Sequence, residues 1–121
     1  MIKARSVQQV KRALTAVDNN PVDDSYAQLV YEKFMIPEAR DAFLSALTGS
    51  ARAPRLNNRL NRIKALTLVL WGKEDHMIPV KFVEPFVKMK KCRIILFENC
   101  GHRPHFERPE LFNKIVSDFL S

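Results

Sequence analysis

Two loops of this 121-residue chain carry side chains that could transfer a proton together. Residues 71–79 read Trp-Gly-Lys-Glu-Asp-His-Met-Ile-Pro and contain Asp75, and residues 98–104 read Glu-Asn-Cys-Gly-His-Arg-Pro and contain His102. A carboxylate that accepts a hydrogen bond from histidine Nδ1 fixes the tautomer of the ring and stabilises its protonated form. A histidine held in this way can take a proton from a nucleophile as a general base. The pair therefore predicts two members of a catalytic triad, with Asp75 as the acid and His102 as the base.

The third member of such a triad, the nucleophile, does not stand out in the sequence. A serine nucleophile in a strand-to-helix turn has the pattern Gly-x-Ser-x-Gly, which does not occur in this chain. Cys100 precedes His102 by only two residues, whereas a nucleophile needs its own turn opposite the base. We therefore interpret Cys100 as a small packed residue, and we expect the chain to be inactive alone.

Three further ionisable side chains lie close to the predicted pair. His76 follows the acid in its turn, and His105 lies where the chain enters its last helical region, so both are weaker candidates for the base. Glu107 is interpreted as a side chain that stabilises the start of the last helix through the helix dipole. No group of His, Cys and carboxylates has the spacing of a metal site, and no glycine-rich phosphate loop is present. We therefore expect no metal and no cofactor.

The elements around the two loops must bring the acid and the base together. The continuous apolar run over residues 65–71 is typical of a strand covered on both faces of a parallel sheet, and residues 93–97 are predicted to form the second strand. A helix is predicted over residues 80–89, with Pro85 interrupting it or starting its regular part, and a last helix starts near Pro109. That helix has an apolar stripe that we expect to be buried, formed by Leu111, Phe112, Ile115, Val116 and Phe119. In a parallel sheet the carboxyl ends of neighbouring strands lie at one edge, where functional side chains gather.

The first half of the chain reads as three short amphipathic helices. The second of them begins after the capping residues 23–25, and the third begins at Pro37 and is closed by Gly49. We therefore predict an α/β chain with two regions. Residues 1–64 form a helical segment, and residues 65–121 form a strand–helix–strand–helix segment of a parallel sheet.

The charge and composition of the chain limit its partners. The formal net charge is +7, and the run from Arg52 to Lys64 alternates arginine with leucine and isoleucine at helical spacing. We interpret that run as a solvated helical face and expect no nucleic-acid partner. No apolar stretch has the length of a membrane span, so we expect no membrane contact. The two cysteines, Cys92 and Cys100, are too few for a disulfide framework, which favours a reduced, cytoplasmic protein.

The predicted strands also imply a partner. Two strands and two helices make a small core, and an unpaired apolar strand edge favours association with other chains. The run at 66–71 therefore needs neighbours, which belong either to an absent amino-terminal half or to another molecule. Pairing of strand 66–71 across a two-fold axis would produce an oligomer.

The two loops and their surroundings resemble the carboxyl-terminal half of the α/β-hydrolase-fold superfamily. Residues 68–75 with Pro79 are similar to the acid loop of that superfamily, and residues 99–102 and 107–113 are similar to its histidine loop and final helix. The helical first part is similar to the cap helices of the subgroup that contains carbon–carbon bond hydrolases and related esterases. Carbon–carbon hydrolases commonly carry tryptophan after the histidine, where this chain has Arg103.

This resemblance implies a truncated, partial α/β-hydrolase fold in which Asp75 is the triad acid and His102 is the triad base. It implies hydrolysis of a small-molecule ester or a related carbonyl compound once an amino-terminal half supplies the nucleophile, which would be Ser, Asp or Cys. The residues leave one alternative open. The chain could be a non-catalytic remnant that self-associates and acts as a binding or regulatory module.

Overall fold

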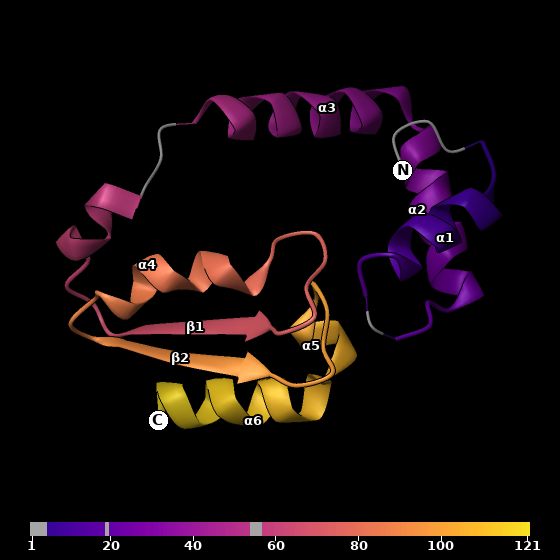
Figure 1. The fold of residues 1–121 in the computed structure, drawn as a ribbon. Coiled ribbons are helices and arrows are strands. Elements are labelled where there is room, and N and C mark those ends of the chain that lie inside the picture. Colours follow the sequence, from indigo (N-terminus) through magenta and orange to yellow (C-terminus); the bar gives the residue numbers. More distant parts are fainter. Residues whose placement is uncertain (1–4, 19, 54–56) are drawn as a thin grey trace. The chain divides into compact units, whose positions relative to one another are not determined.

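The chain divides into two compact units (Figure 1). The computed structural model describes residues 5–18, 20–53 and 57–121. Unit 1 comprises Met1–Ala16 and Pro21–Arg55, and unit 2 comprises Val17–Asn20 and Leu56–Ser121. The sequence places a boundary between residues 64 and 65, where helices give way to strands. The compact units divide between residues 55 and 56, and the short segment Val17–Asn20 belongs with the strands because it bonds to a loop that follows them.

Among its described residues, unit 1 contains three helices, α1 (Val7–Thr15), α2 (Asp24–Met35) and α3 (Pro37–Arg52). The side chain of Asp23 accepts a hydrogen bond of 2.7 Å from the main-chain N–H of Ser25, so Asp23 is the N-cap of α2. The hydroxyl of Ser25 donates to the same carboxylate, and this bond, followed by the main-chain one, lowers the pKa of the Asp23 carboxyl below its ordinary value. Capping at residues 23–25 is therefore confirmed.

The core of unit 1 lies between α1 and α2. Its fully or nearly buried side chains are Val10, Leu14, Val22 and Ala27. The third helix differs from the prediction, because Gly49 lies inside α3 and the helix continues to Arg52. A glycine inside a helix costs only about 1 kcal/mol relative to alanine, and the following residues Ser, Ala and Arg permit helical structure.

In the part of unit 2 that the structure describes, a parallel sheet has two strands, β1 (Thr67–Gly72) and β2 (Cys92–Phe97). The register pairs Thr67 with Cys92 and Gly72 with Phe97, so both strands end at the same edge. Both predicted strands are confirmed within two residues at each end, and so is their parallel pairing. The elements of unit 2 outside the sheet are η1 (Asn57–Arg62), η2 (Val80–Val83), α4 (Glu84–Val87), α5 (Pro104–Glu107) and α6 (Pro109–Leu120).

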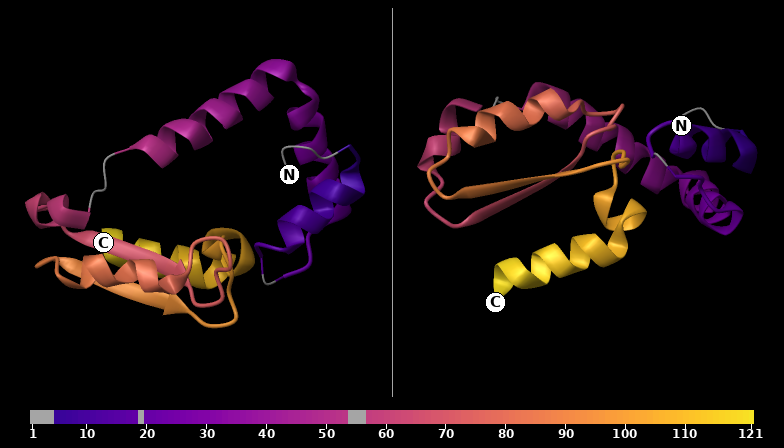
Figure 2. Two further views of the ribbon diagram at one scale, coloured as in Figure 1. Left: turned by 45° about the horizontal axis from the view of Figure 1, so that its top comes forward. Right: turned by 60° about the horizontal axis from the view of Figure 1, so that its bottom comes forward.

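The short helices and α6 lie against the sheet. In the ribbon views, η2 and α4 lie along one face of the strands and α6 lies along the other (Figures 1 and 2). Pro85 lies in the first turn of α4. This position agrees with the predicted alternative in which Pro85 starts the regular part of the helix. The ring of Phe97, at the end of β2, contacts the ring of Phe112 on α6 at a centroid distance of 6.4 Å.

The expected burial of the α6 stripe is wrong for this chain. No residue of α6 is buried, and Leu111 is 51% exposed. On β1, only Val69 and Gly72 are buried. Two strands with these helices supply too little surface to cover both faces, which explains why most positions of the strands are only half-buried here.

Candidate active site

The carboxyl ends of the two strands bring their loops into close contact. The main-chain N–H of Lys73 donates to the carbonyl of Phe97 and that of Glu74 donates to the carbonyl of Cys100, both at 3.0 Å. A Cβ atom placed on Gly72 would lie 2.0 Å from the carbonyl oxygen of Gly101. Only glycine permits this approach of two backbones, so Gly72 allows the acid loop and the histidine loop to touch.

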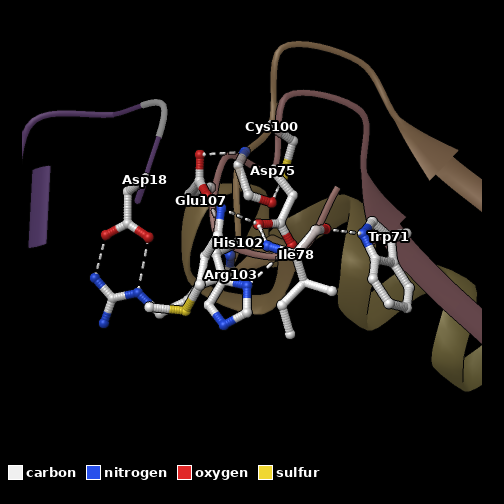
Figure 3. Close-up of polar contacts among 10 residues, drawn as sticks. Asp18, Trp71, Asp75, Ile78, Cys100, His102, Arg103 and Glu107 are labelled. Atoms are coloured by element: carbon white, nitrogen blue, oxygen red, sulfur yellow. Dashed lines mark hydrogen bonds and ion pairs between the residues drawn. The ribbon is translucent and has the colours of Figure 1, made fainter. Parts of the chain in front are cut away.

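Asp75 and His102 meet at this edge, as Figure 3 shows. The Oδ2 atom of Asp75 lies 2.9 Å from Nδ1 of His102. The other oxygen, Oδ1, accepts hydrogen bonds from the main-chain N–H groups of Met77 at 2.9 Å and Ile78 at 2.8 Å. The Asp75 side chain is 4% exposed and the His102 side chain is 30% exposed. The structure therefore brings the two predicted residues together, with the carboxylate fixed and the ring partly open to solvent.

This geometry determines which nitrogen of His102 can act as a base. A carboxylate accepts hydrogen bonds and does not donate them, so the contact with Oδ2 of Asp75 requires a proton on Nδ1. The neutral ring then carries its lone pair on Nε2. The arrangement leaves Nε2 as the proton acceptor and stabilises the ring once it is protonated.

Two glutamates accept hydrogen bonds from main-chain N–H groups of the histidine loop. The Oε2 atom of Glu74 accepts the N–H of Cys100 at 2.8 Å. The carboxylate of Glu107 accepts the N–H of Gly101 at 2.9 Å through Oε2 and the N–H of Arg103 at 3.2 Å through Oε1. The dipole role predicted for Glu107 does not match this geometry, because its buried carboxylate bonds to the loop that precedes α5.

The segment Val17–Asn20 supplies contacts that sequence reasoning missed. The carbonyl of Val17 accepts the N–H of His102 at 3.0 Å. Asp18, whose side chain is fully buried, accepts two hydrogen bonds from the guanidinium of Arg103, one of them at 2.9 Å from Nε (Figure 3). Asp18 and Arg103 are 85 residues apart. No local pattern could therefore have indicated their contact.

A small hollow opens beside the acid and the base. Its volume is about 150 Å³. The residues that line it are Leu70, Trp71, Gly72, Asp75, Ile78, His102 and Pro104. The indole N–H of Trp71 donates to the carbonyl of Ile78 at 3.0 Å, which fixes one wall of the hollow (Figure 3). The hollow is large enough for a small reacting group next to His102.

The remaining candidates lie outside this arrangement. The side chains of His76 and His105 are exposed, and the ring of His105 contacts Phe112 at a centroid distance of 5.9 Å. Cys100 is fully buried, and burial, with a contribution from the nearby Glu107 carboxylate, raises the pKa of its thiol to about 11. Because the thiolate is the reactive form, the interpretation of Cys100 as a packed residue is confirmed.

Within residues 5–18, 20–53 and 57–121, no group of three or more His, Cys, Asp or Glu side chains is arranged to hold a metal ion. Among the helices that the structure describes, none has both the length and the hydropathy needed to cross a bilayer.

Comparisons with known proteins point to one family. Residues 4–115 match the model of the alpha/beta hydrolase family. Monoacylglycerol lipase abhd6-B of Xenopus laevis is 35% identical over 83 residues, which cover 68% of this chain and 24% of that protein. The 2-hydroxy-6-oxononadienedioate/2-hydroxy-6-oxononatrienedioate hydrolase 2 of Pseudomonas putida is 34% identical over 85 residues, which cover 69% of this chain and 30% of that protein.

A solved structure agrees with these relatives. The crystal structure of a membrane phospholipase A, described as a novel bacterial virulence factor, matches this chain with a TM-score of 0.79 at 28% identity. The match covers 96% of this chain and 38% of that chain. The chain thus spans well under half the length of the relatives it matches, 24% and 30% for the two enzymes above.

Proposed function

The chain belongs to the alpha/beta hydrolase family, and we propose that it supplies the acid and the base of a hydrolytic triad whose nucleophile comes from outside these 121 residues. The predicted partial α/β-hydrolase fold is confirmed by the family match and by the likeness to solved structures. The relatives are hydrolases several times longer than the matched segment. This proportion is consistent with a carboxyl-terminal portion of such an enzyme.

The observation that carries the proposal is the contact between Asp75 and His102. The 2.9 Å approach of Oδ2 to Nδ1 and the two main-chain bonds to Oδ1 hold the ring in one orientation. In a complete enzyme, Nε2 of His102 would take the proton of the nucleophile as it attacks the carbonyl carbon, and would then give that proton to the leaving group. Water, activated by the same nitrogen, would release the acyl group.

The proposed substrate is a small-molecule ester or a related carbonyl compound. The names of the relatives include a monoacylglycerol lipase and a hydrolase of 2-hydroxy-6-oxo dienedioates. Hydrolysis of an ester or a related carbonyl compound by a triad proceeds through attack of a nucleophile on the carbonyl carbon, which needs the base that His102 would provide. The nucleophile in the complementary half would be Ser or Cys, whose proton His102 takes, or Asp, which attacks as a carboxylate without a proton, so that His102 would then activate only the water.

The proposed partner of the chain is that complementary half. In the described residues the sheet has two strands, and β1 pairs with β2 on one side only. Leu66, directly before β1, is 74% exposed, and Leu111 and Leu120 on α6 are 51% and 77% exposed. A strand added at the outer edge of β1 would complete its hydrogen bonding and continue the parallel sheet.

The test of the proposal is reconstitution. The chain would be co-expressed with a nucleophile-bearing amino-terminal half, and turnover of a short activated ester would be measured. His102→Ala and Asp75→Asn should each reduce kcat by about 10³-fold or more, while the matched controls His76→Ala and Asp118→Asn, at exposed positions, should retain it. Full activity of either triad variant would contradict the assignment, and turnover by the chain alone would place a nucleophile within it.

The second candidate function rests on the same exposed edge. A chain that uses the outer edge of β1 to pair with a second copy would be a self-associating module without catalytic activity. Light scattering on the purified chain separates the two candidates. A stable dimer that persists when the amino-terminal half is added would favour the module, whereas a one-to-one complex of the two halves would favour the hydrolase.

A further inference from the structure

The structure assigns to Glu107 the positioning of His102, through one carboxylate that holds the main chain on both sides of the histidine. This inference rests on the proposed role of His102 as the base. It concerns how the histidine is held, and Glu107 itself has no contact with the reacting atoms in the proposal.

Three consecutive N–H groups of the histidine loop have hydrogen-bond acceptors. Gly101 donates to Oε2 of Glu107 at 2.9 Å, and Arg103 donates to Oε1 of the same carboxylate at 3.2 Å. Between them, His102 donates to the carbonyl of Val17 at 3.0 Å. Both peptide groups that flank the histidine are thus fixed, and the direction in which its side chain leaves the backbone is fixed with them.

Glu107 is itself held firmly enough to act as this anchor. The residue is 5% exposed. Its N–H donates to the carbonyl of Arg103 at 2.8 Å, and its carbonyl accepts a hydrogen bond of 3.1 Å from Nδ2 of Asn20. A buried carboxylate is costly unless hydrogen bonds satisfy it, and here its two oxygens find their donors in the histidine loop.

To hold both of these N–H groups, residue 107 needs two acceptor atoms in one side chain. Glutamine has nearly the shape of glutamate but offers one oxygen that accepts and one amino group that only donates. In Glu107→Gln, the amino group would face either the N–H of Gly101 or that of Arg103, two donors would oppose each other, and one buried N–H would lose its partner.

Glu74 provides the matched comparison within the same site. Its side chain accepts the N–H of Cys100, also in the histidine loop, through the single atom Oε2 at 2.8 Å. In Glu74→Gln, the carbonyl oxygen of the amide can take over that one bond. The two substitutions therefore change charge and volume equally, but only the change at residue 107 removes a required acceptor.

The readout is the tautomer of His102, measured in the 121-residue chain by ¹⁵N NMR of the imidazole ring. Wild-type protein at a pH where the ring is neutral should show one tautomer, with the proton on Nδ1 facing Asp75. Glu74→Gln should retain it. Glu107→Gln should move a substantial fraction of the ring to the Nε2-protonated form, because a shifted backbone weakens the contact with Oδ2 of Asp75. A folded Glu107→Gln variant with the wild-type tautomer would overturn the inference.

A second measurement applies even if Glu107→Gln fails to fold. Amide hydrogen exchange of the wild-type chain should show the N–H groups of Gly101 and Arg103 protected by on the order of 10²-fold or more relative to an unstructured peptide. Exchange at the unstructured rate would overturn the inference. Neither measurement uses turnover. If the proposed hydrolysis failed because the nucleophile was wrong, both measurements would still test the role of Glu107.

Discussion

Among the described residues, unit 1 buries only an apolar cluster, whereas unit 2 buries charged side chains at one edge of its sheet in addition to apolar ones. The cluster in unit 1 consists of Val10, Leu14, Val22 and Ala27. The buried charged residues among the described ones are Asp18, Asp75 and Glu107, and all belong to unit 2.

The difference shows two ways of specifying a structure. Apolar burial depends on area and tolerates small shifts, whereas a buried carboxylate must find donors at defined distances and angles. Each buried carboxylate of unit 2 has such donors: the guanidinium of Arg103 for Asp18, and main-chain N–H groups for Asp75 and Glu107. The edge that carries Asp75 and His102 is therefore fixed by directional bonds, although apolar side chains elsewhere in unit 2, such as Leu66 and Leu111, remain exposed.

The largest expected effect comes from breaking the buried ion pair of unit 2. Asp18→Ala leaves Arg103, whose side chain is 16% exposed, without its carboxylate partner. Loss of one member of a buried pair costs about 3 to 5 kcal/mol, measured as the free energy of unfolding in urea. The control is Asp24→Ala in unit 1, which removes the pair with Lys11, where the side chains are 74% and 33% exposed. That change should cost less than about 1 kcal/mol, and equal losses would contradict the contrast between the units.

A smaller effect is expected from adding one methyl group to a glycine in each unit. In Gly72→Ala the new Cβ would lie 2.0 Å from a main-chain oxygen of the histidine loop, so the two loops must separate. We expect a loss of about 1 to 3 kcal/mol. In Gly49→Ala nothing lies within 4 Å of the new atom, and α3 should gain about 0.5 to 1 kcal/mol. Urea unfolding of both variants tests this, and destabilisation of similar size at the two sites would count against it.

The smallest effect is a pH dependence at Cys100. Burial raises the pKa of its thiol from an ordinary value of 9.0 to about 11, so the folded chain favours the protonated form. The stabilisation from this difference is fully present below pH 9 and is lost as the pH rises from 9 to about 11. The free energy of unfolding of the wild-type chain should therefore fall more steeply over this range than that of Cys100→Ala. Parallel curves would show that the thiol is not protected at the edge of unit 2.

Sequence reasoning located the strands and the acid–base pair because both depend on local patterns. Apolar runs mark β1 and β2, and each of Asp75 and His102 follows its strand by a few residues. The predicted end of α3 was wrong, because a glycine ends a helix only where the chain turns away from the helical conformation. The burial of the α6 stripe was wrong because a stripe predicts an apolar face but does not supply the surface that covers it.

The sequence by itself determined that an acid and a histidine stand at the ends of two neighbouring parallel strands, since a strand and its loop are set by residues adjacent in the chain. Only the tertiary structure decided what holds the histidine. Asp18 reaches Arg103 across 85 residues, and Glu107 turns back to the N–H groups of Gly101 and Arg103. The physical reason is that such bonds depend on where the backbone places donor and acceptor in space, which no spacing of residue types encodes.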